Sequence, residues 1–520
     1  MRLGVAFHTL GCKLNQLESE ALADSFRSAG AQLVAGVHGA SDDNFDLLVL
    51  NSCTVTGKAE QKARRLIRTA LASHPDAVVL ATGCYAQLDA AALEALHERV
   101  VVVPGEAKAG LLGLATWLFD FWGGHGDLLE ALHEWKLEST RDPGRASGLA
   151  SGFASGLASG GGLAGADERG RFDYHPASFA FHSRPALKVQ DGCDNRCSYC
   201  RVCLARGPSR SLPVEEALAR AQQLEAAGRA EIVLTGVNLS QYRDGSRDFP
   251  GLLARLIAGT HRVAYRISSY EPNRVNPAFL EVFADPRVRA HVHLAVQSGS
   301  DSVLGRMGRA YRSRELLDAA GALRTVRGDP FLAADIIAGF PGETDEEFKA
   351  TLGVCKEARF AWIHAFPFSP RPGTRAEALR PRVPERVAGE RVAALNELAW
   401  NGRADYVRRW SGSEVEAVFE GGDAGICEGA ADDEAALGDL RAPHGGQSSS
   451  RSSSGGGQSS GPPRRATSEN YLKLRIWDSP ADTQGGRAFT CRISGQLDPR
   501  ETGMDAEAEF LKGVVPGGPA

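Results

Sequence analysis

The sequence predicts an α/β protein with three parts: an N-terminal doubly wound parallel-sheet domain, a central partial (βα)6 barrel and a small C-terminal β-barrel. In the first two parts, short apolar segments alternate with amphipathic helical segments, which is typical of parallel sheets. In the last part, apolar and polar residues partly alternate, as they do in half-buried strands. Two tracts rich in glycine and serine interrupt these patterns. We therefore expect domains at 1–137, 181–410 and 411–515, a linker at 138–180 and an insert at about 429–466.

Length and composition describe an ordinary globular protein. A chain of 520 residues with 43% hydrophobic and 24% charged residues has room for about three domains. The longest apolar stretch, Leu111 to Trp122, is interrupted by Asp120 and is shorter than a membrane span, so we expect a buried helix there. The first residues lack the pattern of a signal peptide. We expect a cytoplasmic protein without a membrane span, in which ten cysteines serve metal or redox chemistry rather than disulfides.

In the N-terminal part, a cysteine follows each of the first three predicted strands. The strands are expected over 3–9, 46–50, 77–81 and 100–103, with helices over 15–29 and 58–72. Cys12, Cys53 and Cys84 come within a few residues of the first three strand ends. Because parallel strands end at one edge of a sheet, these thiols are expected to meet there. The alternative is that each is a small buried apolar residue, but three equivalent positions favour ligands.

The central part contains six predicted strands, which fit a partial, open barrel of the TIM type. A helix is expected over 213–228, with proline at its start and glycine at its end, and a long amphipathic helix over 384–410. Active sites of such barrels lie at the carboxyl ends of the strands, and Cys193 follows the first of them. The strands are expected over 186–190, 231–235, 264–268, 291–296, 333–337 and 362–366.

Cys193, Cys197 and Cys200 form a C-x3-C-x2-C run on one short loop. Three thiolates are one fewer than a closed 4Fe–4S cluster needs, so one iron would keep an open position. Cys203 extends the run, and four thiolates would make a closed tetrahedral zinc site. A second cysteine set and a surrounding barrel favour the cluster, and we interpret Cys203 as a bystander.

Low-complexity composition sets two segments apart from the domains. Residues 146–160 read ASGLASGFASGLASG, which predicts a flexible linker, and the insert at about 429–466 is expected to be disordered as well. Beyond and around the insert, strands are expected over 414–419, 471–476 and 489–497. Small β-barrels of this kind often bind oligonucleotides.

The cysteine motifs and several further segments resemble the radical S-adenosylmethionine (SAM) methylthiotransferases, over the whole chain apart from the two low-complexity tracts. The resemblance implies two 4Fe–4S clusters and SAM as cofactors. Cys193, Cys197 and Cys200 would hold the SAM-binding cluster, and Cys12, Cys53 and Cys84 would hold a second cluster that carries sulfur. A methylthio group would then replace a hydrogen of the substrate. The other matching segments are Asn51–Thr56, Ala205–Ser211, Leu294–Asp301, Asp335–Thr344 and Phe366–Thr374.

The resemblance also implies residues that contact SAM. Thr235, Gly236 and Asn238 follow the second barrel strand, where the family contacts the SAM amino group. The alternative for Thr235 and Gly236 is a plain turn at the end of a strand. Further positions implied in the SAM site are Tyr199 near the adenine and, after later strands, Ser268, Gln297 and Gly339.

The substrate implied by the resemblance is a transfer RNA. Arg266–Pro272 and Gly11–Gln16 resemble the branch that acts on N6-threonylcarbamoyladenosine at position 37. The alternatives within the family are isopentenyladenosine at the same position and an aspartate of a ribosomal protein. The expected partners are the anticodon loop, a one-electron reductant and a sulfur source, with the enzyme as a monomer.

A net charge of −5 implies that any RNA contact uses local basic patches. We expect Arg206 and Arg210, next to the cysteine loop, to contact phosphates and Tyr471 to stack on a base. Arg64, Arg65 and Arg68 share one helix, for which a solvated charged face is an equal alternative.

Two rival functions belong to other classes. One is a non-catalytic RNA-binding protein whose cysteines hold zinc, and the other is a carrier that only donates iron–sulfur clusters. The zinc protein has no use for the glycines after barrel strands, and the carrier needs neither the segments facing SAM nor the C-terminal barrel. Both leave much of the chain unexplained.

Overall fold

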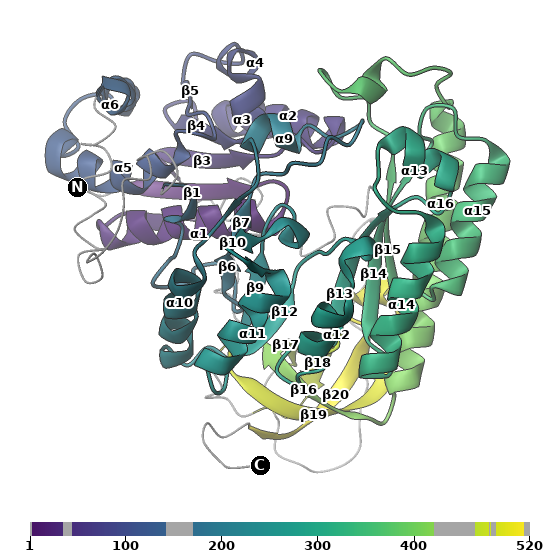
Figure 1. Ribbon diagram of the computed structural model, residues 1–520. Helices are drawn as coiled ribbons and strands as arrows, with labels where there is room; N and C mark the ends of the chain where they lie inside the picture. Colours follow the sequence, from purple (N-terminus) through teal and green to yellow (C-terminus); the bar gives the residue numbers. More distant parts are fainter. Residues whose placement is uncertain are drawn as a thin grey trace, which may run out of the picture.

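The computed structural model describes residues 3–34, 44–141, 170–420, 463–477, 479 and 485–513, and it contains the three predicted parts (Figure 1). The repeat at 146–160 and the expected insert up to residue 462 lie outside the described residues. Within the described ranges, no helix combines the length and hydrophobicity of a transmembrane segment. The α/β fold class is confirmed.

The N-terminal domain is a parallel sheet with strand order β2-β1-β3-β4-β5. Helices α1 (Lys13–Ser28), α5 (Leu111–Trp117) and α6 (Leu128–Arg141) cover one face of this sheet, and α2 (Gly57–Ser73) and α3 (Cys84–Leu88) cover the other. The doubly wound arrangement is thus confirmed, with β2 as a short strand that the sequence analysis missed. The strands are β1 (Gly4–Thr9), β2 (Gln32–Val34), β3 (Leu47–Ser52), β4 (Val78–Gly83) and β5 (Val100–Val102).

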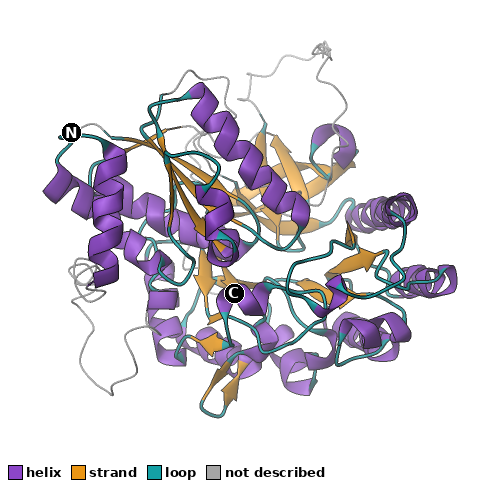
Figure 2. Ribbon diagram, turned by 90° about the horizontal axis from the view of Figure 1, so that it is seen from above, coloured by secondary structure: helices purple, strands orange, loops and turns teal. Residues whose placement is uncertain are grey.

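The central domain is a partial barrel made of two parallel three-stranded sheets, ordered β12-β9-β6 and β13-β14-β15. A bridge between Tyr270 and Leu294 connects the two sheets. Apolar side chains on the outer face of the strands form the main core with the surrounding helices, which lie at the periphery in the view from above (Figure 2). The strands are β6 (Ala186–Lys188), β9 (Glu231–Thr235), β12 (Ala264–Ile267), β13 (His291–Gln297), β14 (Phe331–Ala338) and β15 (Trp362–Pro367).

The first barrel strand is shorter than predicted. After β6 the chain leaves the sheet, and β7 (Gln190–Asp191) pairs with β8 (Arg210–Ser211) in antiparallel register. This pair brackets the cysteine loop and the short helix α9 (Val202–Arg206). The helices outside the barrel are α10 (Val214–Ala226), α11 (Phe249–Gly259), α12 (Pro277–Phe283), α13 (Asp301–Met307), α14 (Ser313–Arg327), α15 (Asp345–Glu357) and α16 (Glu385–Trp410).

The C-terminal domain is a closed five-stranded barrel with order β16-β17-β18-β20-β19, which is TRAM-like. The sequence analysis missed β17 and β20, and β17 begins inside the segment assigned to the insert. The strands are β16 (Glu414–Phe419), β17 (Arg464–Ser468), β18 (Lys473–Trp477), β19 (Ala488–Gln496) and β20 (Ala506–Gly513).

Tyr471 plugs the lower end of the central barrel instead of facing RNA. Its ring is 6% exposed and lies 4.3 Å from the His291 ring and 5.4 Å from the Phe331 ring. The guanidinium of Arg266 lies 5.2 Å from the centre of the same ring. The expected stacking of Tyr471 on a base is therefore wrong, because the side chain is committed to the contact between the two domains.

A buried ionic network reinforces the same contact. Glu231 accepts hydrogen bonds from Arg266 Nε at 2.6 Å and from Arg289 Nε at 2.9 Å. Arg266 also donates to the Ser468 carbonyl of the C-terminal barrel at 3.0 Å, and Arg289 pairs with Glu416. Burial opposes ionisation of Glu231, but the charges of Arg266 and Arg289 outweigh it and hold the Glu231 pKa well below its usual range.

Replacing Tyr471 should loosen the contact between the barrels. Tyr471→Ala removes a buried ring, so we expect the free energy of unfolding to fall by about 3–5 kcal/mol. Urea denaturation measures this loss. The matched control is Phe121→Ala, because Phe121 is 62% exposed and its removal should change stability much less than that of Tyr471. A small effect of Tyr471→Ala would contradict its role as a plug.

Acid should weaken the contact as well. Because the pKa of Glu231 is lower in the folded chain than in the unfolded chain, its stabilising effect is present above about pH 4.3 and is lost as the pH falls further. We expect the thermal unfolding midpoint to fall steeply below that pH. In Glu231→Gln the midpoint should be lower at neutral pH and should depend less on acid, and an unchanged acid dependence would contradict the assignment.

Candidate functional site

The structure brings Cys12, Cys53 and Cys84 together at the carboxyl edge of the N-terminal sheet. Cys12 precedes α1, Cys53 follows β3 directly, and Cys84 begins α3 directly after β4. A Cβ atom placed on Gly11 would lie 2.7 Å from Cys53 Sγ, and Gly11 has a φ of +103°. Glycine is therefore required for this close approach. Because β1, β3 and β4 are neighbours in the sheet, the three thiols lie at one edge of it and form one group.

Cys193, Cys197 and Cys200 form the second group, at the carboxyl end of the central barrel. The loop is fixed by its own backbone, because Cys193 N donates to the Gly207 carbonyl at 3.0 Å and Cys200 N to the Cys197 carbonyl at 3.2 Å. Ser198 anchors it to the barrel by donating from its backbone to the Met307 carbonyl at 2.9 Å.

Each group has one arginine against a sulfur. Arg206 Nε lies 3.3 Å from Cys84 Sγ, and Arg309 Nη1 lies 3.2 Å from Cys197 Sγ. Arg309 is held in place by Glu271, which accepts from Arg309 Nη2 at 2.8 Å. Positive charge beside a sulfur stabilises the thiolate form that metals bind.

Burial keeps several of the other thiols protonated. It raises the pKa of Cys53 to about 12, that of Cys200 to about 12 and that of Cys193 to about 11. A metal centre that binds these sulfurs therefore displaces protons from them. The donor set consists of soft sulfur ligands, which suit iron–sulfur clusters.

The geometry of Cys203 does not fit a zinc site. Cys203 Sγ turns toward the Cys200 carbonyl, 3.9 Å away. Across the described ranges, no three cysteine, histidine or acidic side chains converge closely enough to hold a single metal ion. A four-iron cluster differs, because it spreads its thiolates over several irons. The two groups of three cysteines fit such a cluster better than a mononuclear ion.

Helix α9 clamps the two cysteine groups together, and Figure 1 shows it lying beside α2 and α3. At one end, Arg201 Nη1 donates to Glu60 at 3.3 Å and lies 3.4 Å from Thr54 Oγ1, next to Cys53. At the other end, Arg206 reaches Cys84. The helix that follows Cys200 is therefore bonded to two of the three strand ends that carry the other cysteines.

Arg206 lies at the centre of a buried charge network rather than on the surface. Its guanidinium donates to Glu18 and Asp191, each at 3.1 Å, and to Asn15 Oδ1 at 2.8 Å. It is 9% exposed, so its expected contact with an RNA phosphate is wrong. The reason is that acidic partners on α1 and β7 enclose it, and Glu18 on α1 is 188 positions away in the sequence.

Two lysines complete this network. Lys188 lies 3.2 Å from Glu18 and 2.7 Å from Asp191, and Lys108 also pairs with Glu18. Burial opposes ionisation of Glu18, but Arg206, Lys108 and Lys188 outweigh it and hold the Glu18 pKa well below its usual range. Three cations thus face two carboxylates, which leaves one net positive charge beside Cys84.

The residues expected to contact SAM surround the cysteine loop. Asn238 Nδ2 lies 4.0 Å from Cys193 Sγ, and Tyr199 packs edge-on against Phe340, next to Gly339, with ring centres 6.5 Å apart. Ser268 Oγ is buried and has no hydrogen-bond partner in the described part of the chain. Gln297 has a φ of +66° at a bulge that ends β13. An orphaned hydroxyl and a strained residue beside the loop fit a polar cofactor.

Packing explains the two glycines of this set. A Cβ on Gly236 would lie 2.8 Å from Gln190 Oε1, and one on Gly339 would lie 2.6 Å from Ala388 Cβ in α16. Thr235 is buried, and its carbonyl accepts from Val189 N at 3.0 Å. These three residues therefore shape the strand ends.

The arginines expected near RNA differ in exposure. Arg210 is exposed on β8, next to the cysteine loop. Arg65 and Arg68 are exposed on α2, whereas Arg64 is half-buried and donates to the Tyr85 hydroxyl at 2.7 Å. The exposed arginines of this set thus lie on α2 and β8.

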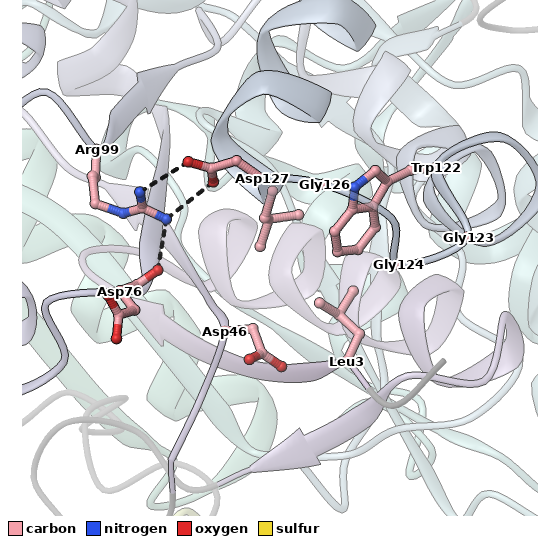
Figure 3. Close-up of a pocket in the computed structure, with 10 residues that line it drawn as sticks. Leu3, Asp46, Asp76, Arg99, Trp122, Gly123, Gly124, Gly126 and Asp127 are labelled. Carbon is pink, nitrogen blue, oxygen red and sulfur yellow. Dashed lines mark hydrogen bonds and ion pairs between the residues drawn. The ribbon is translucent and has the colours of Figure 1, made fainter.

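A cavity of about 440 Å³ lies at the other end of the N-terminal sheet, among Leu3, Asp46 and Trp122 (Figure 3). Arg99 closes one side of it through paired contacts with Asp127 at 3.3 Å. Because none of the cysteines lines this cavity, it is separate from the candidate site.

Sequence reasoning missed the polar residues that support the cysteines: Arg309, Glu271, Glu18, Asp191, Lys188 and Lys108. The signal was weak, because single charged residues within helical or strand patterns give no indication of their partners. Two of them lay within segments that had been singled out: Glu271 in Arg266–Pro272 and Asp191 directly before the cysteine loop.

Comparison with known proteins places this site in a family. Residues 187–355 match the radical SAM superfamily, and residues 4–105 match the uncharacterized protein family UPF0004. The chain is 45% identical to the threonylcarbamoyladenosine tRNA methylthiotransferase MtaB of Treponema pallidum, covering 80% of this chain and 91% of that protein. The chain belongs to the radical SAM tRNA methylthiotransferase family.

Other relatives are more distant. The chain is 34% identical to the tRNA-2-methylthio-N(6)-dimethylallyladenosine synthase of Sorangium cellulosum, covering 80% of this chain and 81% of that protein. Among solved structures, the radical SAM methyltransferase TsrM of Kitasatospora setae gives a TM-score of 0.46 at 14% identity, covering 72% of this chain and 77% of that one. As a radical SAM methylthiotransferase, the protein uses SAM and iron–sulfur chemistry.

Removing Arg206 should separate the two cysteine domains of this methylthiotransferase. Arg206→Met leaves Glu18 and Asp191 buried without their shared cation, so we expect a loss of about 3–5 kcal/mol in stability. Denaturation of the metal-free protein measures this loss. Arg314→Met is the matched control, because the Arg314 side chain is 84% exposed and its ion pair lies on the surface. Equal stability of the two variants would contradict the proposed network.

Proposed function

We propose that this enzyme converts N6-threonylcarbamoyladenosine at tRNA position 37 to its 2-methylthio derivative and uses two 4Fe–4S clusters to do so. The main support is the pair of cysteine groups that α9 joins. Each consists of three thiols with one arginine against a sulfur. Two such groups side by side suit a reaction in which one centre activates SAM and the other delivers sulfur.

In this proposal, Cys193, Cys197 and Cys200 hold the cluster that binds SAM. When bound, the cluster and SAM supply the one-electron chemistry that removes hydrogen from an unreactive C–H bond. Ser268 and Asn238 would offer polar side chains to SAM, and Tyr199 would contact its adenine. Thr235, Gly236, Gln297 and Gly339 shape the surrounding strand ends.

Cys12, Cys53 and Cys84 hold the second cluster, which carries the sulfur. Arg206 fixes Cys84 and places positive charge next to it. A one-electron reductant and a sulfur source complete the reaction. The enzyme works as a monomer in the cytoplasm.

Two observations favour threonylcarbamoyladenosine over isopentenyladenosine as the substrate. The relative at 45% identity is named for the threonylcarbamoyl substrate, and the dimethylallyladenosine synthase shares only 34%. Arg266–Pro272 and Gly11–Gln16 also resemble the threonylcarbamoyl branch. Arg210, exposed beside the cysteine loop, is the candidate for a phosphate contact.

The test is anaerobic reconstitution, followed by iron and sulfide analysis and by mass spectrometry of nucleosides from tRNA treated with SAM and reductant. We expect about eight irons per chain and a methylthio mark on N6-threonylcarbamoyladenosine. A methylthio group on isopentenyladenosine instead would identify that nucleoside as the substrate and leave the proposed chemistry unchanged. Zinc without iron would overturn the proposal.

Cysteine variants separate the two clusters in the same assay. Cys197→Ala should abolish the formation of 5′-deoxyadenosine, whereas Cys53→Ala should still form it but yield no methylthio product. Cys203→Ala is the matched control in the loop and should retain both activities, because its sulfur turns toward the Cys200 carbonyl. A fully active Cys53→Ala would remove the case for a second cluster.

A further inference from the structure

The inner face of the central barrel has three levels along β13. Val292, Leu294 and Val296 belong to the core between the strands and the outer helices. Because side chains alternate along a strand, His291 and His293 point to the opposite, inner face. His291 contacts the Tyr471 plug at the lower end, and Gln297 ends β13 at the carboxyl end of the barrel. His293 therefore occupies the level between the plug and the cofactor region.

At this middle level, His293, Asp335 and His364 form a polar layer on three neighbouring strands. His293 Nε2 lies 3.0 Å from Asp335 Oδ1. The imidazole rings of His293 and His364 stack with centres 5.1 Å apart and planes 8° apart. Trp362 Nε1 donates to His364 Nδ1 at 3.2 Å. Asp335 lies opposite His364 in the register of β14 and β15.

The polar layer is accessible from the inside of the barrel. The Asp335 side chain is 30% exposed and that of His293 is 14% exposed, although β14 is the middle strand of its sheet. His364 is 5% exposed. A carboxylate kept open to water on the inner face of a barrel is a feature of a binding surface rather than of a core.

The geometry of the purine directs its N6 substituent toward this layer. C2, where the methylthio group is added, would face the cysteines in the proposed reaction. C6, which carries N6, is separated from C2 only by N1, so the exocyclic bonds at C2 and C6 diverge obliquely rather than in opposite directions. A substituent on N6 therefore points obliquely away from the cysteine loop. His293 is four residues before Gln297, but the bulge between them means that they span three residues of the neighbouring strand β14, which corresponds to about 10 Å. A purine and an extended N6 substituent together span a similar length.

We propose that His293, Asp335 and His364 bind the polar N6 substituent of the target adenosine, a carbamoyl-linked amino acid. This inference rests on the proposed function. The substituent's N–H and O–H groups would donate to Asp335, and its oxygens would accept from the imidazoles. An isopentenyl group offers none of these hydrogen bonds, so its binding would desolvate the layer without compensation. The layer thus selects between two adenosines that share the same C2 chemistry.

The test compares anticodon stem-loops that carry either N6-threonylcarbamoyladenosine or isopentenyladenosine. His364→Phe keeps a ring of similar size but removes its hydrogen bonding, and Asp335→Asn keeps the shape of the side chain. For each variant we expect kcat/KM for the threonylcarbamoyl substrate to fall roughly tenfold or more, with no fall for the isopentenyl substrate. His261→Phe, at an exposed position, is the matched control.

Binding to the metal-free protein gives a second readout that does not depend on the clusters. Fluorescence anisotropy should show a roughly tenfold higher Kd for the threonylcarbamoyl stem-loop in both variants and unchanged binding of the isopentenyl one. Equal losses with both stem-loops, or no loss with either, would overturn the inference. If wild-type enzyme modifies only isopentenyladenosine, the proposed substrate fails instead, so the two failures are distinguishable.

Discussion

The ionic contact between Arg206 and Glu18 determines how the two cysteine groups face each other. It joins a residue that follows the barrel cysteines to the helix that follows Cys12, and the same guanidinium touches Cys84. Burying these charges is unfavourable unless every one of them has partners, and here Lys188, Lys108 and Asp191 provide them. Such a network has strict geometric requirements. It therefore suits a reaction in which a group must move a fixed short distance from one centre to the other.

A second buried network, around Glu231, fixes the C-terminal barrel to the opposite end of the central barrel. Buried salt bridges thus fix the central domain to the N-terminal domain at one end and to the C-terminal barrel at the other. The inner face of the barrel lies between the two networks. Tyr471 closes one end of it, and the cysteine loop lies at the other end. The C-terminal barrel thus contributes the side chain that closes one end of the central barrel.

Much of the fold could be predicted from the sequence, because hydrophobic periodicity and strand-end cysteines are local signals. The six barrel strands and the carboxyl-edge position of Cys12, Cys53 and Cys84 follow from such signals. Two strands lack such local signals. β2 has only three residues, and β17 begins with Arg464 and Arg465 in a segment whose composition predicts disorder.

The roles of Arg206 and Tyr471 could not be predicted, since their environment depends on residues far away in the sequence. Arg206 follows a cysteine loop and is followed by glycine, which reads like an exposed basic turn. Only the tertiary structure shows that Glu18, 188 positions earlier, encloses it. Tyr471 stands in a polar stretch, and its burial depends on His291 and Phe331 of another domain. Long-range pairing of this kind leaves no trace in local composition.

The pairing of β16 with β17 has a consequence for the length of the chain. Phe419 lies opposite Ala466 in the antiparallel register, so the chain leaves and re-enters the barrel at neighbouring points of one edge. A connection between such points can lengthen or shorten at little entropic expense, because the cost of closing a loop grows only slowly with its size. The stability of the barrel therefore depends little on the length of the sequence between these two strands. Relatives can differ greatly there and still fold alike, and the same position would accept a tag or a foreign domain.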